Sequence, residues 1–306
     1  MIILVTGCCG FIGFHLSEKL LLLGHEVHGL DSMDNYYDMS LKEINLKDLK
    51  EYKNFKFFKE DVRKTDIIKN NKPDFVYHLA GLAGVRNSLN NASLYFDVNV
   101  NGFINILDQC VSNKVKKIIY ASSSSVYGLN KKIPFSEEDE IKKCNSPYAC
   151  SKLTAENLAR TYYQLYNLPS IGFRFFTVYG PRGRPDMAPR KFLNSIYNNQ
   201  EITKYGDGKT FRDYTYISDI IDGLISSLNR KEKDCQIYNL GSGKATTLNK
   251  LIETCEKVTM KKAIIKQEVE QLGDVPKTLS NISKARRDLK YEPKVYLEEG
   301  LQKIIL

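Results

Sequence analysis

The sequence predicts an α/β protein with a doubly wound parallel sheet, followed by a smaller, mixed α/β substrate domain towards the C-terminus. Up to about residue 176, short apolar runs typical of buried strands alternate with helical patterns, the order that builds a parallel sheet with right-handed crossovers. Beyond this point the turn-rich segment 179–185 is followed by shorter elements of both kinds. We therefore expect a first domain over residues 1–176, with a return segment near 235–245, and a second domain over most of 177–306.

The N-terminal segment predicts a strand, a tight turn and a helix. The apolar run Ile2–Val5 leads into Gly7, Gly10 and Gly13, and apolar residues then recur at helical spacing over 11–23. Glycines in such a turn let the backbone approach a pyrophosphate, and a helix N-terminus adds amide groups and partial positive charge. The pattern therefore predicts a Rossmann-type dinucleotide site, with a tight turn in some other α/β protein as the alternative.

The second predicted strand, residues 26–30, ends at an acidic residue. Asp31 falls about where a carboxylate binds the adenosine ribose hydroxyls. The following residues, 32–35, add no basic side chain for a 2′-phosphate. We therefore expect NAD rather than NADP as the cofactor.

Two further strands end in residues suited to the same ligand. The alternating run 55–59 is the third predicted strand, and Asp61 and Val62 after it are expected beside the adenine. Ligands gather outside the carboxyl ends of such strands. The fourth strand, 74–80, runs into the small-residue turn 81–86, where close approach of a ligand is possible.

A long helix is expected over about 91–110, and a fifth strand over 117–121. That strand ends in a run of serines, Ser122 to Ser125. A serine run is often a flexible linker. A linker does not normally follow a buried apolar strand, so we favour a functional site at this strand end.

One face of a later helix carries a phenol and an ammonium group. Pro147 suits the first turn of a helix, which places Tyr148 and Lys152 at i and i+4 on one face. A free tyrosine has a pKa near ~10, and a neighbouring cation favours the phenolate and lowers that pKa. Such a pair alone more often marks a solvated face, but together with the N-terminal turn it predicts a catalytic base. The sixth strand is expected over 170–175.

Composition argues against several classes of protein. The chain has 306 residues, 42% of them hydrophobic, which is enough for a large core. Its seven cysteines contain no C-x-x-C pattern, so we expect neither a disulfide framework nor a metal site, and we expect a cytoplasmic protein. The net charge of +9 comes from lysines scattered among acids, which does not indicate nucleic acid as a partner, and no segment indicates a membrane span.

Taken together, these motifs resemble the extended short-chain dehydrogenase/reductase superfamily, and within it the nucleotide-sugar 4-epimerases. The resemblance rests on the three N-terminal glycines, on Tyr148 and Lys152, and on the diphosphate-binding stretch Phe211–Tyr214. A finer likeness to UDP-glucuronate 4-epimerases is carried by shorter stretches along the chain, at residues 34–38, 84–86, 122–128, 174–181, 183–188 and 273–276.

The resemblance implies roles for individual residues. Ser123 stands four residues before Tyr127, at the place of the hydroxyl that relays a proton between the sugar oxygen and Tyr148. Contacts to NAD are implied for Gly7, Gly10, Phe11, Ile12, Gly13, Asp31, Asp61, Val62, Leu79, Ala80, Gly81, Asn99, Ser122, Tyr148 and Lys152. Contacts to the UDP-sugar are implied for Arg86, Ser124, Ser125, Thr177, Arg184, Met187, Arg212 and Asp274.

Two of the serines also bear on the reaction. Ser124 and Ser125 occupy the positions where the 4,6-dehydratases of the superfamily carry Asp-Glu, and Ser125 the one where its UDP-glucuronate decarboxylases carry Glu. Without a carboxyl group to move protons at C5 and C6, dehydration has no obvious catalyst. Epimerisation is therefore the expected chemistry.

The expected activity is the NAD-dependent conversion of UDP-glucuronate to UDP-galacturonate, through transient oxidation at C4 and rotation of the 4-keto sugar. The alternatives are a UDP-glucose or UDP-N-acetylglucosamine 4-epimerase, a reductase or dehydratase that acts once, and a non-catalytic NAD-binding scaffold. Helices near 91–110 and 147–166 resemble the pair that forms a four-helix dimer interface in this superfamily, so a homodimer is expected.

Overall fold

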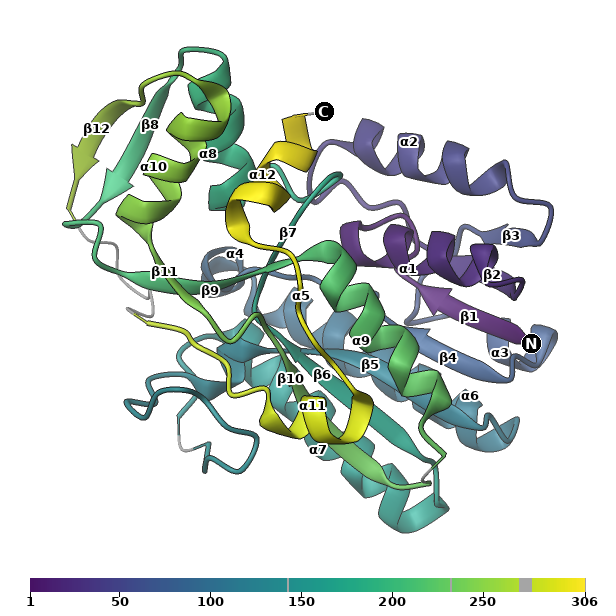
Figure 1. Cartoon of the computed structure of the whole chain (residues 1–306). Helices are drawn as coiled ribbons and strands as arrows, with labels where there is room; N and C mark the ends of the chain where they lie inside the picture. The colour runs from purple at the N-terminus through teal and green to yellow at the C-terminus, as the bar shows by residue number, and fades with distance from the viewer. Residues whose placement is uncertain (142, 232, 270–276, 306) are drawn as a thin grey trace. The chain divides into compact units, whose positions relative to one another are not determined.

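A computed structural model describes residues 1–141, 143–231, 233–269 and 277–305 of the chain (Figure 1). The chain forms two compact units. The first unit comprises residues 1–128, 140–174 and 224–238, and the second comprises 129–139, 175–223 and 239–306. Segment 129–139 therefore belongs to the second unit, although it lies far before residue 176. The amide of Phe135 donates to Leu279 O at 2.8 Å, and its carbonyl accepts from Asn281 N at 2.9 Å.

The first unit is built on a seven-stranded sheet with the order β10-β6-β5-β4-β1-β2-β3. The strands are β1 (Ile2–Thr6), β2 (Glu26–Leu30), β3 (Phe55–Phe58), β4 (Phe75–His78), β5 (Lys117–Ser123), β6 (Ser170–Phe175) and β10 (Cys235–Leu240). All neighbours are parallel: β1 pairs with both β2 and β4, and β10 lies along β6 through bonds from Ser170 N to Asp234 O and from Phe176 N to Leu240 O. The predicted doubly wound parallel sheet is confirmed.

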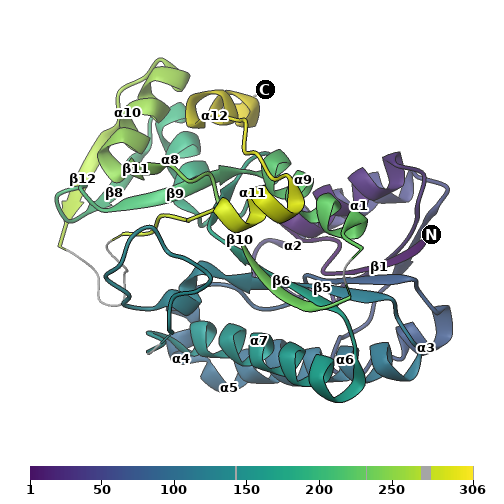
Figure 2. The ribbon, with the colours of Figure 1, turned by 60° about the horizontal axis from the view of Figure 1, so that its bottom comes forward.

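Helices cover both faces of this sheet. The helical segments of the first unit are α1 (Phe11–Leu22), α2 (Met39–Lys50), α3 (Ile67–Asn71), α4 (Val85–Asn90), α5 (Ala92–Phe96), α6 (Gly102–Ser112), α7 (Pro147–Tyr166) and the C-terminal half of α9 (Ile217–Asn229). Helices α3, α6 and α7 lie on one face, and α1 and α2 lie on the other (Figure 2). The inner strands are accordingly largely buried: all six residues of β6 are buried, the polar Ser170 and the charged Arg174 among them.

The helix predicted over 91–110 is not uniform. Between α5 and α6 the backbone makes a π-helical turn, Asp97–Asn101. Turns of this kind are rare and frequently occur at functional sites. The side chain of Asn99 leaves from this turn and is buried. Side-chain periodicity does not distinguish such a turn from α-helix, so the sequence did not predict it.

The second unit has two small sheets. One has the order β11 (Ala245–Thr247), β9 (Phe211–Tyr216), β7 (Thr177–Tyr179), and the other pairs β8 (Glu201–Tyr205) with β12 (Ile264–Glu268). Its helices are α8 (Ala188–Tyr197), α10 (Leu248–Thr259), α11 (Ser283–Leu289) and α12 (Leu297–Ile305). In the described ranges, no helix combines the length and the apolar character needed to cross a membrane.

A buried carboxylate joins the parts of the second unit. Asp213, on β9, is fully buried. It accepts hydrogen bonds from the backbone and hydroxyl groups of Ser242, from Gly243 N, and from both N and Oγ of Ser280. A buried charge needs this many donors to offset its lost hydration. Its neighbour Arg212 is therefore carried on a strand with little freedom to shift.

Candidate active site

The predicted glycine turn lies at the carboxyl end of β1. Gly7 has φ +73°, a conformation that favours glycine, and a Cβ built on it would lie 2.8 Å from Ala80 N. A Cβ on Gly13 would lie 2.0 Å from Gly7 O, so only glycine lets α1 start this close to the turn. Helix α1 begins at Phe11 with no side-chain cap. The amides of Phe11, Ile12 and Gly13 therefore form an N-terminus suited to an anion.

Asp31 lies next to this turn, and hydrogen bonds from the backbone orient its carboxylate. It is buried, and its oxygens accept from Cys9 N at 3.1 Å and Met33 N at 2.9 Å. The buried ammonium of Lys42, from α2, lies 3.6 Å from Asp31 and 3.1 Å from Asp34. No basic residue follows Asp31 directly, as the sequence indicated, but the fold brings one in from eleven residues away. Two carboxylates face this single cation, so the local charge still favours a ribose hydroxyl over a phosphate.

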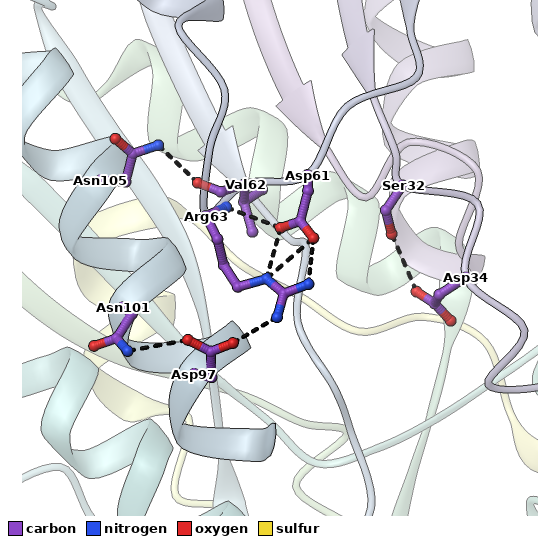
Figure 3. A network of polar contacts seen from close by, with 8 residues as sticks. All are labelled: Ser32, Asp34, Asp61, Val62, Arg63, Asp97, Asn101 and Asn105. Carbon is purple, nitrogen blue, oxygen red and sulfur yellow. Dashed lines mark hydrogen bonds and ion pairs between the residues drawn. The ribbon is translucent and has the colours of Figure 1, made fainter. Parts of the chain in front are cut away.

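Asp61 takes part in a polar network beyond β3 (Figure 3). Arg63 donates to both carboxylate oxygens of Asp61 and also to Asp97, on the π-helical turn. Hydrogen bonds from Arg63 hold the pKa of the Asp61 carboxyl below its usual value. Val62 is buried, and its carbonyl accepts from Asn105 at 2.8 Å. The network fixes the expected adenine-binding residues to the turn that carries Asn99.

Asn99 in turn connects the loop after β4 to the helix that carries Tyr148. Its Oδ1 accepts from Leu82 N at 2.7 Å, and its Nδ2 donates to Ser151 Oγ at 3.0 Å. Ser151 donates to Tyr148 O at 2.8 Å. A Cβ on Gly81 would lie 2.9 Å from Asn99 Oδ1 and 3.5 Å from Lys152 Nζ, so this loop passes close to the predicted catalytic lysine.

Helix α7 presents Tyr148 and Lys152 as predicted. Ser146 caps the helix by accepting from Ala149 N at 3.1 Å, and Pro147 occupies the first turn. Both functional side chains are buried, at 9% and 8% exposure, and Lys152 Nζ lies 6.0 Å from the centre of the Tyr148 ring. The ammonium donates to Ala121 O at 2.9 Å. Burial lowers the pKa of Lys152 to about 8.

The serines at the end of β5 have different partners. Ser123 Oγ accepts from Ser125 N at 3.1 Å, which uses a lone pair and leaves the hydroxyl proton available for donation. Ser122 is buried, and its hydroxyl donates to Glu156, on α7. Ser122 can therefore contact a cofactor only through its backbone. Ser124 and Ser125 are partly exposed in the short 3₁₀ turn Ser124–Tyr127.

The predicted substrate residues are distributed over both units. Arg86 is exposed in the first turn of α4, in the first unit. In the second unit, Thr177 begins β7 and pairs with Tyr214, and Arg212 Nη1 donates to Phe211 O at 3.0 Å. Arg184 forms a two-point ion pair with Asp186, at 3.0 and 2.6 Å.

Two predicted substrate residues remain. Met187 immediately precedes α8. Asp274 lies outside the described residues. The structure thus brings Ser123, Tyr148 and Lys152 together within one unit, with the glycine turn and Asp31 at the same edge of the sheet.

Several residues of this site were not predicted. Lys42 and Arg63 contact predicted residues but carry no pattern of their own, although Arg63 directly follows the Asp61-Val62 pair. Glu156 did have a signal: it continues the i, i+4 series of Tyr148 and Lys152 by one more turn.

This set of hydrogen-bond donors and acceptors fits a dinucleotide. It consists of the uncapped amides of α1, the neighbouring carboxylate of Asp31 and the buried Lys152, whose pKa is about 8. The fold and this set of side chains define an extended short-chain dehydrogenase/reductase. The sequence model of the GDP-mannose 4,6 dehydratase family matches residues 4–304. The chain belongs to this family.

Individual relatives support the narrower assignment. A UDP-glucuronate 4-epimerase of Thermodesulfobacterium geofontis is 41% identical over 307 residues, which cover 99% of this chain and 94% of the relative. The crystal structure of UDP-glucuronic acid 4-epimerase from Bacillus cereus, in complex with UDP-glucuronic acid and NAD, aligns with a TM-score of 0.95 and 36% identity, over 99% of this chain and 98% of that one. A UDP-glucose 4-epimerase of Thermotoga maritima, solved with UDP-glucose, aligns with a TM-score of 0.91 and 30% identity, over 100% and 97% of the two chains. The predicted resemblance to nucleotide-sugar 4-epimerases is confirmed.

Proposed function

We propose that this protein is an NAD-dependent 4-epimerase of a UDP-hexose that interconverts UDP-glucuronate and UDP-galacturonate. The observation that carries the proposal is the buried Tyr148–Lys152 pair on α7, in the same unit as the Ser123 hydroxyl at the end of β5. The relatives named UDP-glucuronate 4-epimerase support the choice of reaction and sugar.

NAD would be held by the α1 amides at its pyrophosphate, by Asp31 at its adenosine ribose and by Lys152 at its nicotinamide ribose. When bound, NAD supplies the reversible oxidation and reduction at C4 of the sugar. Asp61, Val62 and the loop Leu79–Gly81 are the residues we assign to the remaining cofactor contacts, together with Asn99. Arg63 keeps the Asp61 carboxylate ionised and oriented through its hydrogen bonds.

The protein's own residues move the proton. Tyr148 accepts the proton of the 4-hydroxyl, through or beside Ser123, and returns it to the same oxygen after the sugar has turned. The Lys152 ammonium favours the phenolate form of Tyr148 and so makes the phenol a base near neutral pH. Ser123 suits a relay because a backbone amide already occupies one of its lone pairs and orients its hydroxyl.

The serines at 124 and 125 support epimerisation over dehydration. The family is described by the name of a dehydratase. This chain, however, has hydroxyls at the two positions where the 4,6-dehydratases of the superfamily carry Asp-Glu. Hydroxyls cannot exchange protons with C5 and C6 at neutral pH as carboxyl groups do. The intermediate therefore has no obvious route to dehydration.

A carboxylate on the sugar sets a further demand. Oxidation of glucuronate at C4 creates a β-keto acid, which loses CO₂ most easily when the carboxylate bond stands perpendicular to the carbonyl plane. The enzyme must hold that group still. We assign this task to the hydroxyls of Ser124, Ser125 and Thr177 and to the guanidinium of Arg184, which would exchange its partner Asp186 for the substrate.

The UDP part needs a fixed anchor while the sugar rotates. We assign the diphosphate to Arg212, which is carried next to the Asp213 hub on β9. Arg86, Met187 and Asp274 are proposed to complete the UDP-sugar contacts. A UDP-glucose or UDP-N-acetylglucosamine 4-epimerase is the second candidate, and the relative of Thermotoga maritima favours it.

We propose a homodimer in the cytoplasm as the working form. The large apolar side chains of Leu94 and Phe96, on α5, and of Leu165, near the end of α7, are exposed at 46%, 38% and 65%. Exposed apolar side chains on two neighbouring helices suit an interface between helices. All seven cysteines are free thiols, which suits a reducing compartment.

The test uses the purified protein with UDP-glucuronate, UDP-glucose and UDP-N-acetylglucosamine in separate reactions without added cofactor. We expect the C4 epimer of UDP-glucuronate to form to equilibrium, with bound NAD recovered unchanged. Preference for an uncharged sugar would move the assignment to the second candidate. Free NADH or a keto sugar in stoichiometric amount would indicate a single-pass reductase or dehydratase, and no turnover on any of the three would indicate a scaffold.

A further inference from the structure

A buried ion pair lies one helical turn behind the catalytic lysine. Glu156, on α7, and Arg174, on β6, are 3% and 4% exposed. Arg174 donates from Nε to Glu156 Oε1 at 2.9 Å and from Nη2 to Oε2 at 2.7 Å. This two-point geometry fixes the guanidinium and the carboxylate in one plane.

The position of Glu156 on the helix relates the pair to the site. Tyr148, Lys152 and Glu156 stand at i, i+4 and i+8, so they lie along one stripe of α7. The helix can rotate or slide on the sheet only if Glu156 moves with the other two. A restraint on Glu156 is therefore a restraint on the phenol and the ammonium.

A third contact joins the pair to the other half of the site. Ser122 Oγ donates to Glu156 Oε1, and Ser122 is the residue before Ser123 in β5. One carboxylate thus connects the helix of Tyr148 to the strand of Ser123 and, through Arg174, to β6. The guanidinium also lies 4.7 Å from the centre of the Tyr127 ring, at the end of the 3₁₀ turn that follows Ser123.

Stability alone does not account for such a pair. Removing two charges from water costs several kcal/mol for each ion, and apolar residues of similar volume often stabilise a core as well or better. A buried pair can instead select one geometry, because a shifted helix would leave both charges without partners. At this place in the fold, the selected geometry is that of Ser123 relative to Tyr148.

We propose that Glu156 and Arg174 are positioning residues that set the register of α7 against β5, and so keep the Ser123 hydroxyl and the Tyr148 phenol in relay distance for the proposed epimerase. The inference rests on the proposed function. It assigns no contact with substrate or cofactor to either residue.

The test compares kcat, KM for UDP-glucuronate and bound NAD in Glu156→Gln and Arg174→Lys with those of the wild type. Gln places an N–H against the Arg174 N–H groups, and Lys loses the two-point geometry while keeping the charge. We expect kcat to fall by about 10- to 100-fold, the scale of a small misplacement of reacting groups, with KM and bound NAD within about 3-fold of the wild type. Glu156→Gln should lower kcat far less in a Ser123→Ala background. Without the Ser123 hydroxyl, the geometry that Glu156 maintains no longer contributes to turnover.

A matched control is available in the same sheet, at the amino-terminal ends of its strands. Arg230 and Asp234 also form a two-point ion pair, just before β10 starts, and the backbone of Asp234 accepts from Ser170 N at the start of β6. Asp234→Asn should lower the melting temperature and leave kcat unchanged. Ser122→Ala is the second variant if Glu156→Gln does not fold, because it keeps the ion pair and cuts only the link to β5; a reduced kcat at normal KM is expected.

The outcomes separate this inference from the proposed function. Absence of turnover in the wild type would overturn both. Normal wild-type turnover with an unchanged kcat in the folded Glu156→Gln or Ser122→Ala variant would overturn the positioning role alone. The same role would be overturned if Glu156→Gln lowered kcat as much in the Ser123→Ala background as it does in the wild type.

Discussion

Lys152 should make the cofactor-free protein less stable at neutral pH than at alkaline pH. Its ammonium is buried, the partner it donates to is the neutral carbonyl of Ala121, and burial lowers its pKa from 10.5 to about 8. In the unfolded chain the pKa returns to its ordinary value. Between these two values the unfolded state binds more protons than the folded state, so stability rises with pH across this window.

The size of the effect follows from the two pKa values. A pKa difference between 10.5 and about 8 corresponds to a penalty of about 3 kcal/mol at pH 7, falling below about 1 kcal/mol at pH 10. Lys152→Met keeps most of the apolar stem and removes the charge. At pH 7 the free energy of unfolding of the variant should rise by the size of this penalty, less about 1–2 kcal/mol because Ala121 O loses its hydrogen bond. Because the hydrogen bond does not titrate, the difference between variant and wild type should change by about 2–3 kcal/mol from pH 7 to pH 10.

Urea unfolding of NAD-free protein at several pH values between 7 and 10 measures this difference directly. Groups that titrate in this range away from Lys152 are common to both proteins and cancel. Lys69→Met, at an exposed site on α3, is the control and should show no trend with pH. A difference for Lys152→Met that stays constant from pH 7 to pH 10 would refute the reasoning, since it would mean that the lysine titrates alike in both states.

Three further substitutions test the site. Tyr148→Phe keeps the ring but deletes the proton acceptor, so turnover should fall by about 10²–10⁴-fold while binding of the UDP-sugar, measured by calorimetry, survives; near-normal turnover would contradict the mechanism. Asp31→Ala should weaken NAD and narrow the preference against NADP, because it removes one of the two carboxylates that face Lys42; an unchanged ratio of the two dissociation constants would exclude Asp31 from the cofactor site. Arg184→Ala should lose activity on UDP-glucuronate far more than on UDP-glucose and release CO₂ as a side product; equal losses on both sugars would remove the guanidinium from the carboxylate site.

Local patterns predicted the parts of the fold that local forces determine. The alternation of apolar runs and helical patterns predicted six of the strands in the large sheet, and the glycine spacing predicted the turn after β1. The i, i+4 spacing of Tyr148 and Lys152, with Pro147 in the first turn, likewise predicted α7 and the face that carries both side chains. In each case the period of the backbone relates positions that are close in sequence.

Contacts between distant segments were not predictable in this way. Lys42 reaches Asp31 because α2 returns over the turn, and Arg63 reaches Asp97 across thirty-four residues. Phe135 joins the second unit through bonds to Leu279 and Asn281, although it follows a strand of the first unit by only twelve residues. A single sequence carries no periodic signal for such pairs, because the geometry that creates them is set by the packing of whole elements.

The buried charges described at the carboxyl edge of the sheet differ in one respect. Lys42 faces two carboxylates and Arg174 faces Glu156, so each is neutralised by the protein itself. Lys152 instead donates to the neutral carbonyl of Ala121, and burial lowers its pKa to about 8. A cation left without a carboxylate responds to any negative charge that forms nearby, and a phenolate on Tyr148 stabilises the ammonium by as much as the ammonium stabilises the phenolate. The proposed proton transfer therefore depends on the charge of Lys152, which favours the phenolate of Tyr148.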